Sequence, residues 1–262
     1  MDMQHLEGSI VALVTPFNDD GSVDFEALDR LIEFQIENGT DGILTLGTTG
    51  ESSTMSHEED NEVCRFVVER VGGRVPVIAG SGSNSTETML EKSLAYQKLG
   101  VDGLLIITPY YNKANEEGIY RHLATVADGV DIPCILYNIP GRIAHLIGPE
   151  FRMFSGEDGI AVPLMSLGAS GVISVWANVQ PALVHEMCRA YLDGDTQRAR
   201  EIQIAGQPLV HALFSEVNPI PVKEALAQMG LIKANYRLPL CPMSEGARSG
   251  LTKAMKEAGL LA

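Results

Sequence analysis

Polar residues suited to binding and protonating a small carboxylic acid follow six short apolar runs of the chain. They lie at 15–16, 47–51, 80–82, 108–112, 137–142 and 155–158. Hydroxyl groups and the backbone N–H groups of glycine-rich turns can bind one carboxylate, and the Arg142 guanidinium can bind a second. A tyrosine such as Tyr137 can relay protons when a neighbour stabilises its phenolate. Each motif alone is also explained by a tight turn or by packing, but together they predict a site for a small acid.

The apolar runs themselves predict strands, and the segments between them predict helices. We expect strands at 10–16, 41–47, 75–80, 102–109, 133–140, 151–156 and 170–175, each apolar enough to be buried on both faces. Helical periodicity marks 24–38, 56–71, 86–99 and 116–130, with Asp24 and Ser56 as N-caps. Gly39, Gly100 and Gly168 each stand where a helix must stop before the next strand, which suits the left-handed conformation.

Strands that alternate with helices imply a parallel sheet with right-handed crossovers. For 262 residues the leading fold is α/β, a TIM (β/α) barrel-like architecture, and a doubly wound open sheet is the alternative. Further helical segments at 180–193, 196–216, 219–229 and 244–258 supply the last barrel helix and a C-terminal helical extension. We therefore expect a barrel over 1–195 and an extension over 196–262.

The spacing of the predicted strands changes in the middle of the chain. The first five begin near 10, 41, 75, 102 and 133, close to the about 30 residues per unit of an eight-unit barrel. The next two begin near 151 and 170, and only residues 141–150 separate the fifth strand from the sixth. A parallel crossover that contains a helix needs at least about 10–12 residues. The chain thus shows seven recognisable strands instead of eight.

Composition restricts the classes of partner. Nineteen basic and 34 acidic residues give a net charge of −15, which argues against nucleic acid and against an anionic membrane surface. No apolar run approaches the about 18 residues of a membrane span, and residues 1–7 lack a signal-peptide core. Four scattered cysteines form no metal-binding pattern, so we expect buried thiols and no metal site. We also expect a cytoplasmic protein whose partners are small molecules. These cysteines are Cys64, Cys134, Cys188 and Cys241.

Taken together, the motifs resemble those of the dihydrodipicolinate synthase and N-acetylneuraminate lyase family. The matching stretches are 8–12, 15–16, 47–52, 108–112, 137–142, 171–175 and 218–223. The resemblance runs from Gly8 to about Ile147 and resumes at Phe151. It implies a pyruvate-dependent class I aldolase on a (β/α) barrel, without a cofactor. Tyr-Tyr-Asn at 110–112 and Asn-Pro-Ile-Pro-Val-Lys at 218–223 favour the synthase branch, which condenses pyruvate with aspartate semialdehyde in lysine (diaminopimelate) biosynthesis.

The resemblance also implies roles for individual residues. Thr48 and Thr49 resemble the groups that bind the pyruvate carboxylate and relay a proton, and Tyr137 resembles the acid/base tyrosine. Tyr111 resembles a tyrosine that reaches into a neighbouring subunit's site, which implies a homo-oligomer, either a dimer or a tetramer. Arg142 resembles the residue that binds the carboxylate of the aldehyde.

A second group of residues is implied to line the pocket or to bind an effector. Gly156 and Ile173 resemble backbone contacts of the pocket. Asp60 and Thr88 depart from the polar residues that some family members carry at an effector site for lysine. His57 is as typical of an exposed helix end as of that effector site. The residues implied for that effector site are Ser52, Ser53, His57, Asn84 and Tyr110.

The lysine that the family's chemistry requires has no counterpart in this sequence. The family forms a Schiff base on a lysine of the sixth strand, whose amine is kept neutral by desolvation inside the barrel. The seven lysines here all fall on predicted helices or outer loops, and none lies between Lys113 and Lys223. The interval without lysine includes the place where the strand spacing collapses. About one βα unit, roughly 30 residues, is therefore predicted to be missing between Ile147 and Phe151.

Three interpretations follow from the missing lysine. The first is a synthase-type chain that has lost Schiff-base activity. The second is a non-catalytic paralogue that binds pyruvate or lysine, or joins a mixed oligomer. The third is a deletion that leaves unpaired strand edges and a poorly folded barrel. Lys223 is assigned a structural role, and a divalent ion held by Glu51, Glu157 and Asp158 is disfavoured because no histidine accompanies them.

Overall fold

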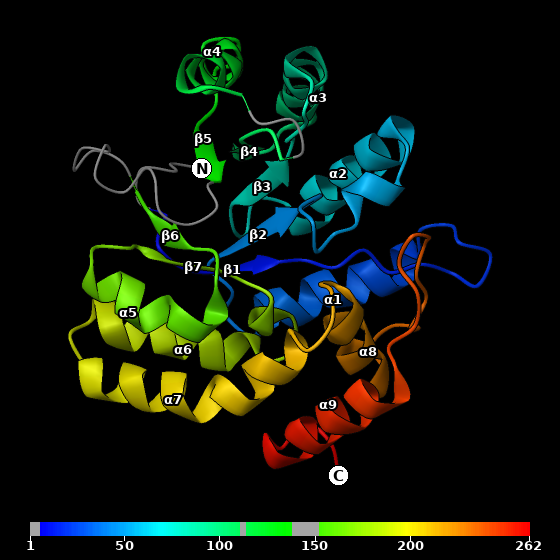
Figure 1. The fold of residues 1–262 in the computed structure, drawn as a ribbon, viewed down its shortest axis with the longest axis vertical. Coiled ribbons are helices and arrows are strands. Elements are labelled where there is room, and N and C mark those ends of the chain that lie inside the picture. The colour runs from blue at the N-terminus through cyan, green and yellow to red at the C-terminus, as the bar shows by residue number, and fades with distance from the viewer. Residues whose placement is uncertain (1–5, 111–113, 138–151) are drawn as a thin grey trace.

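The computed structural model describes residues 6–110, 114–137 and 152–262. Its strands form one parallel sheet in the order β5-β4-β3-β2-β1-β7-β6 (Figure 1). The strands are β1 (Gly8–Ala12), β2 (Gly42–Thr45), β3 (Val77–Gly80), β4 (Gly103–Ile107), β5 (Cys134–Tyr137), β6 (Phe154–Ser155) and β7 (Gly171–Ser174). All seven correspond to predicted strands.

The order of the strands distinguishes the two predicted architectures. From β1 to β5 each strand pairs with the next in the chain, and β1 also pairs with β7. In a (β/α) barrel, too, neighbouring strands follow one another in sequence. A doubly wound sheet would instead reverse its winding at a switch point. β5 and β6 are the outermost strands among the described residues, and no ladder joins them. The fold is therefore a seven-stranded TIM-barrel-like sheet that curls through part of a barrel.

Helices follow the strands and cover the outer side of the sheet. They are α1 (Phe25–Glu37), α2 (His57–Val71), α3 (Thr86–Leu99), α4 (Glu116–Ala127), α5 (Ala161–Ser166) and α6 (Pro181–Leu192). The six-residue helix α5 was not predicted, because it is too short to show helical periodicity. No helix within the described ranges is long and apolar enough to cross a membrane.

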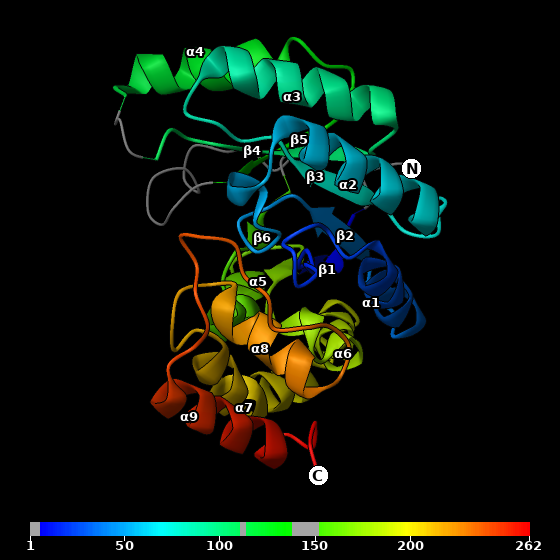
Figure 2. The same ribbon diagram turned by 90° about the vertical axis from the view of Figure 1, so that its right-hand side faces the viewer.

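The C-terminal region is helical, as predicted. It contains α7 (Thr196–Leu213), α8 (Ile220–Gln228) and α9 (Glu245–Glu257), which lie together at one end of the molecule (Figure 2). Helix α7 packs against α6 as well as against α9, so the extension shares a core with the sheet and its helices. The division at residue 196 stays a prediction.

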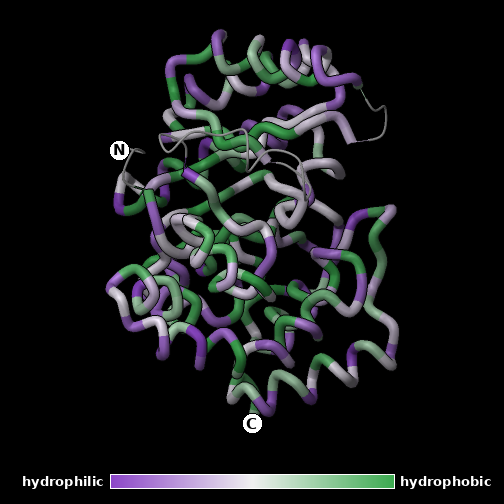
Figure 3. The backbone as a smooth tube through the Cα atoms, turned by 60° about the vertical axis from the view of Figure 1, so that its left-hand side comes forward, coloured by the Kyte–Doolittle hydropathy of each residue, from purple (hydrophilic) through white to green (hydrophobic). Residues whose placement is uncertain are grey.

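Apolar side chains bury both faces of the sheet. Val11 and Ile43 point outward into the large core beneath the helices, whereas Ile10, Leu44 and Ile78 belong to a smaller cluster on the inner face. This alternation follows from the two-residue period of a strand. Hydrophobic residues gather at the centre of the molecule, and hydrophilic ones recur along the outer helices (Figure 3). The prediction of strands buried on both faces is confirmed for β1, β2 and β3. It is wrong for β5, where Leu136 is 42% and Tyr137 40% exposed, because β5 is an outermost strand among the described residues.

The predicted ends of the helices are also confirmed. The Asp24 carboxylate accepts a hydrogen bond from the backbone N of Ala27 at the start of α1 (2.9 Å). Ser56 and Glu59 form a reciprocal capping box at the start of α2. Gly39 and Gly100 have φ angles of 81° and 91°, in the left-handed region that stops a helix.

The prediction that all four cysteines are buried is wrong for Cys241, which is exposed in the loop between α8 and α9. Cys64 and Cys188 are buried, and Cys134 is half-buried. Burial raises the pKa of the Cys64 thiol to about 12. The buried thiols therefore stay protonated and behave as small apolar side chains.

Candidate functional site

The turn after β2 is held closely against its neighbours. The backbone N of Gly50 donates to the oxygen of Gly47 (3.0 Å), and the Thr15 hydroxyl donates to the oxygen of Gly50 (2.7 Å). An added Cβ at Gly50 would lie 3.1 Å from the backbone N of Leu46. Glu51 closes the turn with a φ of 55°, which only a well-constrained non-glycine residue adopts. Gly50 is thus needed for the tight path of the backbone.

The two threonines of the turn have different environments. The Thr48 side chain is exposed, whereas only 4% of Thr49 is exposed. The Asn218 amide donates a hydrogen bond to the Thr49 hydroxyl (2.8 Å). Because that bond uses a lone pair of the oxygen, the hydroxyl proton of Thr49 remains available to another acceptor. Thr49 is therefore oriented as a donor, which is what a proton relay requires.

A buried ion pair fixes this turn to the C-terminal region. Lys223 of α8 donates to the Glu51 carboxylate (2.5 Å), and the two residues are 0% and 1% exposed. The ammonium also lies 4.3 Å from the ring centre of Phe17 and 5.3 Å from that of Tyr236. Burial lowers the pKa of Lys223 and raises that of Glu51, and the opposite charge of each partner counteracts the effect. This amine is enclosed and paired, in keeping with the structural role expected for Lys223.

Tyr137 and Gly156 lie together, although they come from the two outermost strands. Tyr137 ends β5 with 40% of its surface exposed, and Gly156 follows β6. A Cβ placed on Gly156 would lie 3.2 Å from Cε2 of the Tyr137 ring. Ile173 of β7 is half-buried, packs against the inner apolar cluster and is in register with Ile10. The structure thus brings the predicted acid/base tyrosine against one predicted pocket residue.

The residues predicted for an effector site fall into separate local environments. Asn84 accepts a hydrogen bond from the backbone N of Tyr110 (2.9 Å), and the Tyr110 side chain is 63% exposed. Ser53 and His57 are exposed at the end of the turn and the start of α2. The Ser52 hydroxyl, by contrast, belongs to a buried polar cluster with side chains of α2 and α3.

Two of the three acidic residues considered for a divalent ion, Glu51 and Asp158, have other partners. Glu51 is paired with Lys223, and Glu157 is exposed. Asp158 accepts hydrogen bonds from the backbone N of Val175 (2.9 Å) and of Trp176 (3.0 Å), and burial raises its pKa. Within the described ranges no group of three or more His, Cys, Asp or Glu side chains could hold a metal. Tyr111 and Arg142 lie outside the described residues.

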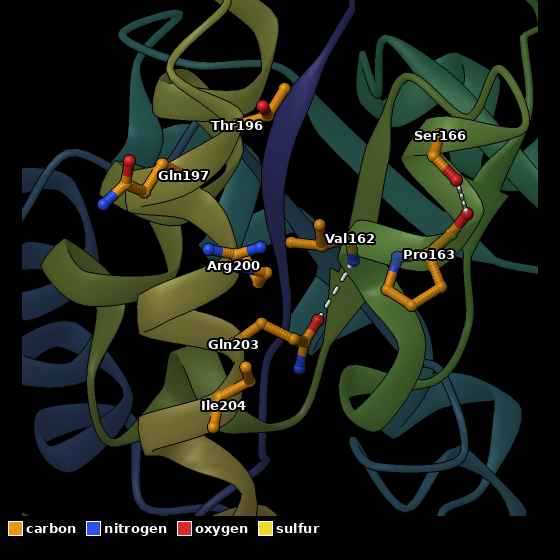
Figure 4. Close-up of a pocket in the computed structure, with 8 residues that line it drawn as sticks. All are labelled: Val162, Pro163, Ser166, Thr196, Gln197, Arg200, Gln203 and Ile204. Atoms are coloured by element: carbon orange, nitrogen blue, oxygen red, sulfur yellow. Dashed lines mark hydrogen bonds between the residues drawn. The ribbon is translucent and has the colours of Figure 1, made fainter.

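A surface hollow of about 550 Å³ between α5 and α7 is separate from these residues (Figure 4). The backbone N of Val162 donates to the Gln203 side chain across it (3.0 Å). None of the predicted site residues lines the hollow, which lies between outer helices rather than at the carboxyl ends of strands. The site of a parallel α/β fold is expected at those strand ends. The hollow is therefore not the candidate site.

Comparison with known proteins decides the family. The profile of the "Dihydrodipicolinate synthetase family" matches residues 5–151 and 141–258. The chain belongs to the dihydrodipicolinate synthetase family. It is 44% identical over 289 aligned residues to a 4-hydroxy-tetrahydrodipicolinate synthase of Pelobacter propionicus, which covers 97% of this chain and 99% of the relative.

Solved structures of the family have the same fold. The dihydrodipicolinate synthase of Aquifex aeolicus superposes with a TM-score of 0.94 at 43% identity, covering 97% of this chain and 98% of that one. The chloride-inhibited synthase of Acinetobacter baumannii, solved in complex with pyruvate, superposes with a TM-score of 0.93 at 40% identity. That match covers 98% of this chain and 100% of the other. The resemblance drawn from the motifs is confirmed.

The comparison also locates a break in the family pattern. The alignment with the relative spans 289 residues, although this chain has only 262, so the relative carries residues that this chain lacks. The family profile matches in two segments that meet at 141–151. The predicted strand spacing collapses at the same place. The family profile and the strand spacing therefore point to one interruption between β5 and β6, while the alignment length shows only that the relative carries residues that this chain lacks.

Two contributors near the site were missed as site residues by sequence reasoning: Asn218 and Lys223. The signal for Lys223 was present, because a lysine that follows three apolar residues in a mostly apolar helix such as α8 is expected to be buried with an acidic partner. Asn218 lies in the quoted 218–223 motif, but its partner Thr49 is 169 positions away. Nothing in the local sequence identifies such a partner.

Proposed function

We propose that this chain is a synthase-type family member that binds pyruvate but does not form the Schiff base. One observation carries the proposal. Among the described residues every lysine lies on a helix or in a loop, and none lies on a strand. The segments 1–5 and 138–151 contain no lysine at all, which leaves Lys113 as the one lysine outside the described ranges. An imine-forming enzyme needs a lysine within its strand-lined pocket.

The buried lysine of the chain does not meet that need. Lys223 has no exposed surface and donates to Glu51, so a keto acid has no path to its nitrogen. In imine catalysis the neutral amine attacks the keto carbon and water leaves. The resulting enamine carbon then attacks the aldehyde. Without an accessible amine the methyl group of pyruvate is not activated, and the condensation lacks its nucleophile.

Binding of pyruvate is supported by the residues that remain. The turn at 47–51 offers the Thr48 and Thr49 hydroxyls to a carboxylate, whereas the backbone N–H groups of Gly50 and Glu51 are used inside the turn. The Acinetobacter baumannii relative holds pyruvate, which makes pyruvate the ligand of choice for this turn. Tyr137 stands beside Gly156 at the strand ends. We assign to Tyr137 the position of the acid/base tyrosine of the synthases, and we propose that Gly156 and Ile173 line the pocket.

The remaining family roles are proposed on resemblance. Arg142 would bind the second carboxylate, and Tyr111 would complete the site of a neighbouring subunit in a homo-oligomer. On the same resemblance we propose a cytoplasmic location and an origin in lysine biosynthesis. The alternative function is a non-catalytic subunit of a mixed oligomer with a complete synthase. The buried, hydrogen-bonded Thr49 favours retained binding over a site without any function.

The proposal is tested by measuring pyruvate binding and synthase turnover on the same preparation. Calorimetry is expected to show pyruvate binding, and Thr49→Val is expected to weaken it about tenfold by removing one hydrogen bond. Thr125→Val is the matched control, because Thr125 bonds only its own helix α4 on the exposed side. Turnover of pyruvate with aspartate semialdehyde is expected to be undetectable. Turnover at the rate of the Aquifex aeolicus synthase, assayed in parallel, would contradict the proposal.

A further inference from the structure

A buried ammonium group lies between α2 and α3, next to the predicted effector residues. The Lys92 side chain is 12% exposed, and its Nζ donates to Asp60 Oδ2 (2.8 Å) and to the Ser52 hydroxyl (3.2 Å). Ser52 in turn donates to the same Asp60 oxygen (3.0 Å). The Tyr96 ring centre lies 5.8 Å from the ammonium. A carboxylate, a hydroxyl and an aromatic face thus surround one cation.

The surroundings of Asp60 make that cation necessary. Asp60 is 1% exposed, and its second oxygen, Oδ1, is buried without a hydrogen-bond partner. The Tyr96 hydroxyl is also buried, and burial together with the nearby Asp60 carboxylate raises its pKa. Burial raises the pKa of Asp60, while the Lys92 ammonium counteracts the shift. A buried carboxylate without a compensating charge costs several kcal/mol or takes up a proton.

We propose that Ser52, Asp60 and Tyr96 form an alkylammonium-binding cage, and that Lys92 is its permanent internal ligand. The ammonium of Lys92 uses the Ser52 hydroxyl that the family resemblance assigns to a lysine effector. The chain therefore carries its own cation at this position, and free lysine is excluded from it. This inference does not depend on whether the chain binds pyruvate.

The cage is connected to the candidate site through the backbone. Ser52 begins the short 3₁₀ helix η2 (Ser52–Thr54), directly after Glu51 of the turn at 47–51. Lys223 fixes Glu51 from α8, and Lys92 fixes Ser52 from α3. Two lysines from different helices thus bind adjacent residues, Glu51 and Ser52. A cation that is always present keeps this end of the turn in one arrangement, whereas an exchangeable effector would allow two.

The proposal is tested by chemical rescue. Lys92→Ala removes the atoms from Cγ to Nζ, a volume that matches propylammonium. Loss of the pair is expected to lower Tm by roughly 5–15 °C. Propylammonium chloride is expected to restore part of that shift in Lys92→Ala but to leave the wild-type Tm unchanged. The neutral alcohol 1-propanol and sodium chloride at equal concentrations control for the alkyl chain and for ionic strength.

Two further variants separate a specific cage from a general salt effect. In Lys92→Met the side chain fills the cage, so propylammonium is expected to give no rescue. In Lys92→Ala/Asp60→Asn the carboxylate is gone, and rescue is again expected to be absent. Rescue of the double variant equal to that of Lys92→Ala would overturn the proposal.

The wild-type chain supplies a test that does not require a folded variant. Titration with free lysine is expected to cause no shift in Tm and no heat in calorimetry, because the cage is filled. A saturable rise in Tm with lysine, abolished by Ser52→Ala, would show an exchangeable effector site and would refute the internal-ligand proposal.

Discussion

Replacement of Lys223 by methionine probes the ion pair that ties α8 to the candidate site. The substitution removes the charge and keeps an apolar side chain of similar length between Phe17 and Tyr236. It leaves the Glu51 carboxylate, which is 1% exposed, without its partner at 2.5 Å. Removing one member of a buried pair costs about 3–5 kcal/mol. Against a typical unfolding free energy of about 5–15 kcal/mol, this is a large loss.

The pH dependence of that loss follows from the Glu51 carboxyl. Burial raises its pKa above the ordinary 4.5, and without Lys223 only the smaller effects of Arg237 counteract burial. A carboxyl whose pKa is higher in the folded state loses stability as the pH rises from 4.5 through the folded pKa. We therefore expect the deficit of Lys223→Met relative to the wild type to grow as the pH rises above 4.5.

Urea unfolding followed by circular dichroism and by the fluorescence of the single tryptophan, Trp176, measures the loss. Lys233→Met is the matched control, because Lys233 forms a similar pair with Asp19 on the exposed surface, and no measurable change is expected. Lys223→Met/Glu51→Gln should recover most of the lost stability. A deficit of Lys223→Met below about 1 kcal/mol, independent of pH, would refute the interpretation of a buried charged pair.

Three further predictions concern the packing of the site and the interruption of the fold. Gly156→Ala places a Cβ 3.2 Å from the Tyr137 ring, so the ring must shift and pyruvate affinity measured by calorimetry should fall several-fold. Gly206 lies in α7, and Gly206→Ala drives a Cβ into the Trp176 ring. Thermal unfolding should show a loss of about 1–3 kcal/mol in the free energy of unfolding. If a βα unit with the Schiff-base lysine is missing, as we propose, insertion of the corresponding unit of the Aquifex aeolicus synthase between 147 and 151 should restore measurable synthase turnover.

Each of these predictions has a matched control. Gly159→Ala, whose Cβ would lie 3.7 Å from the nearest atom, should leave pyruvate affinity unchanged. Gly250→Ala on α9 meets open space, and it should stabilise the protein by up to about 1 kcal/mol. The same insertion with its lysine changed to alanine should fold and bind pyruvate without turnover. Activity in that last variant would show that the chain's own residues suffice.

Many strands and helix starts could be predicted, because they depend on residues that are close together in the sequence. Continuous apolar runs predict strands buried on both faces, and the caps at Asp24 and Ser56 mark the starts of helices. The strand ends were predicted less well. Leu13 and Val14 extend the first apolar run, but they are buried in the loop that follows β1. Burial alone does not distinguish a strand from a loop that crosses the end of the sheet.

The candidate site could be predicted only as far as its contiguous motifs extend. Thr49 and Glu51 stand in one motif, but their partners Asn218 and Lys223 lie 169 and 172 positions away. The same holds for Lys92, whose partner Asp60 lies on another helix. Lysines on helices are usually solvated, and only the tertiary packing of α3 and α8 shows that these two are buried.

Borohydride trapping tests the central claim most directly. The protein is incubated with pyruvate and sodium borohydride, and the intact mass and its peptides are analysed, with the Aquifex aeolicus synthase as the positive control. The claim predicts a reduced pyruvate adduct on the control and none on this chain. An adduct mapped to any lysine of this chain would contradict it and would identify the amine that replaces the missing one.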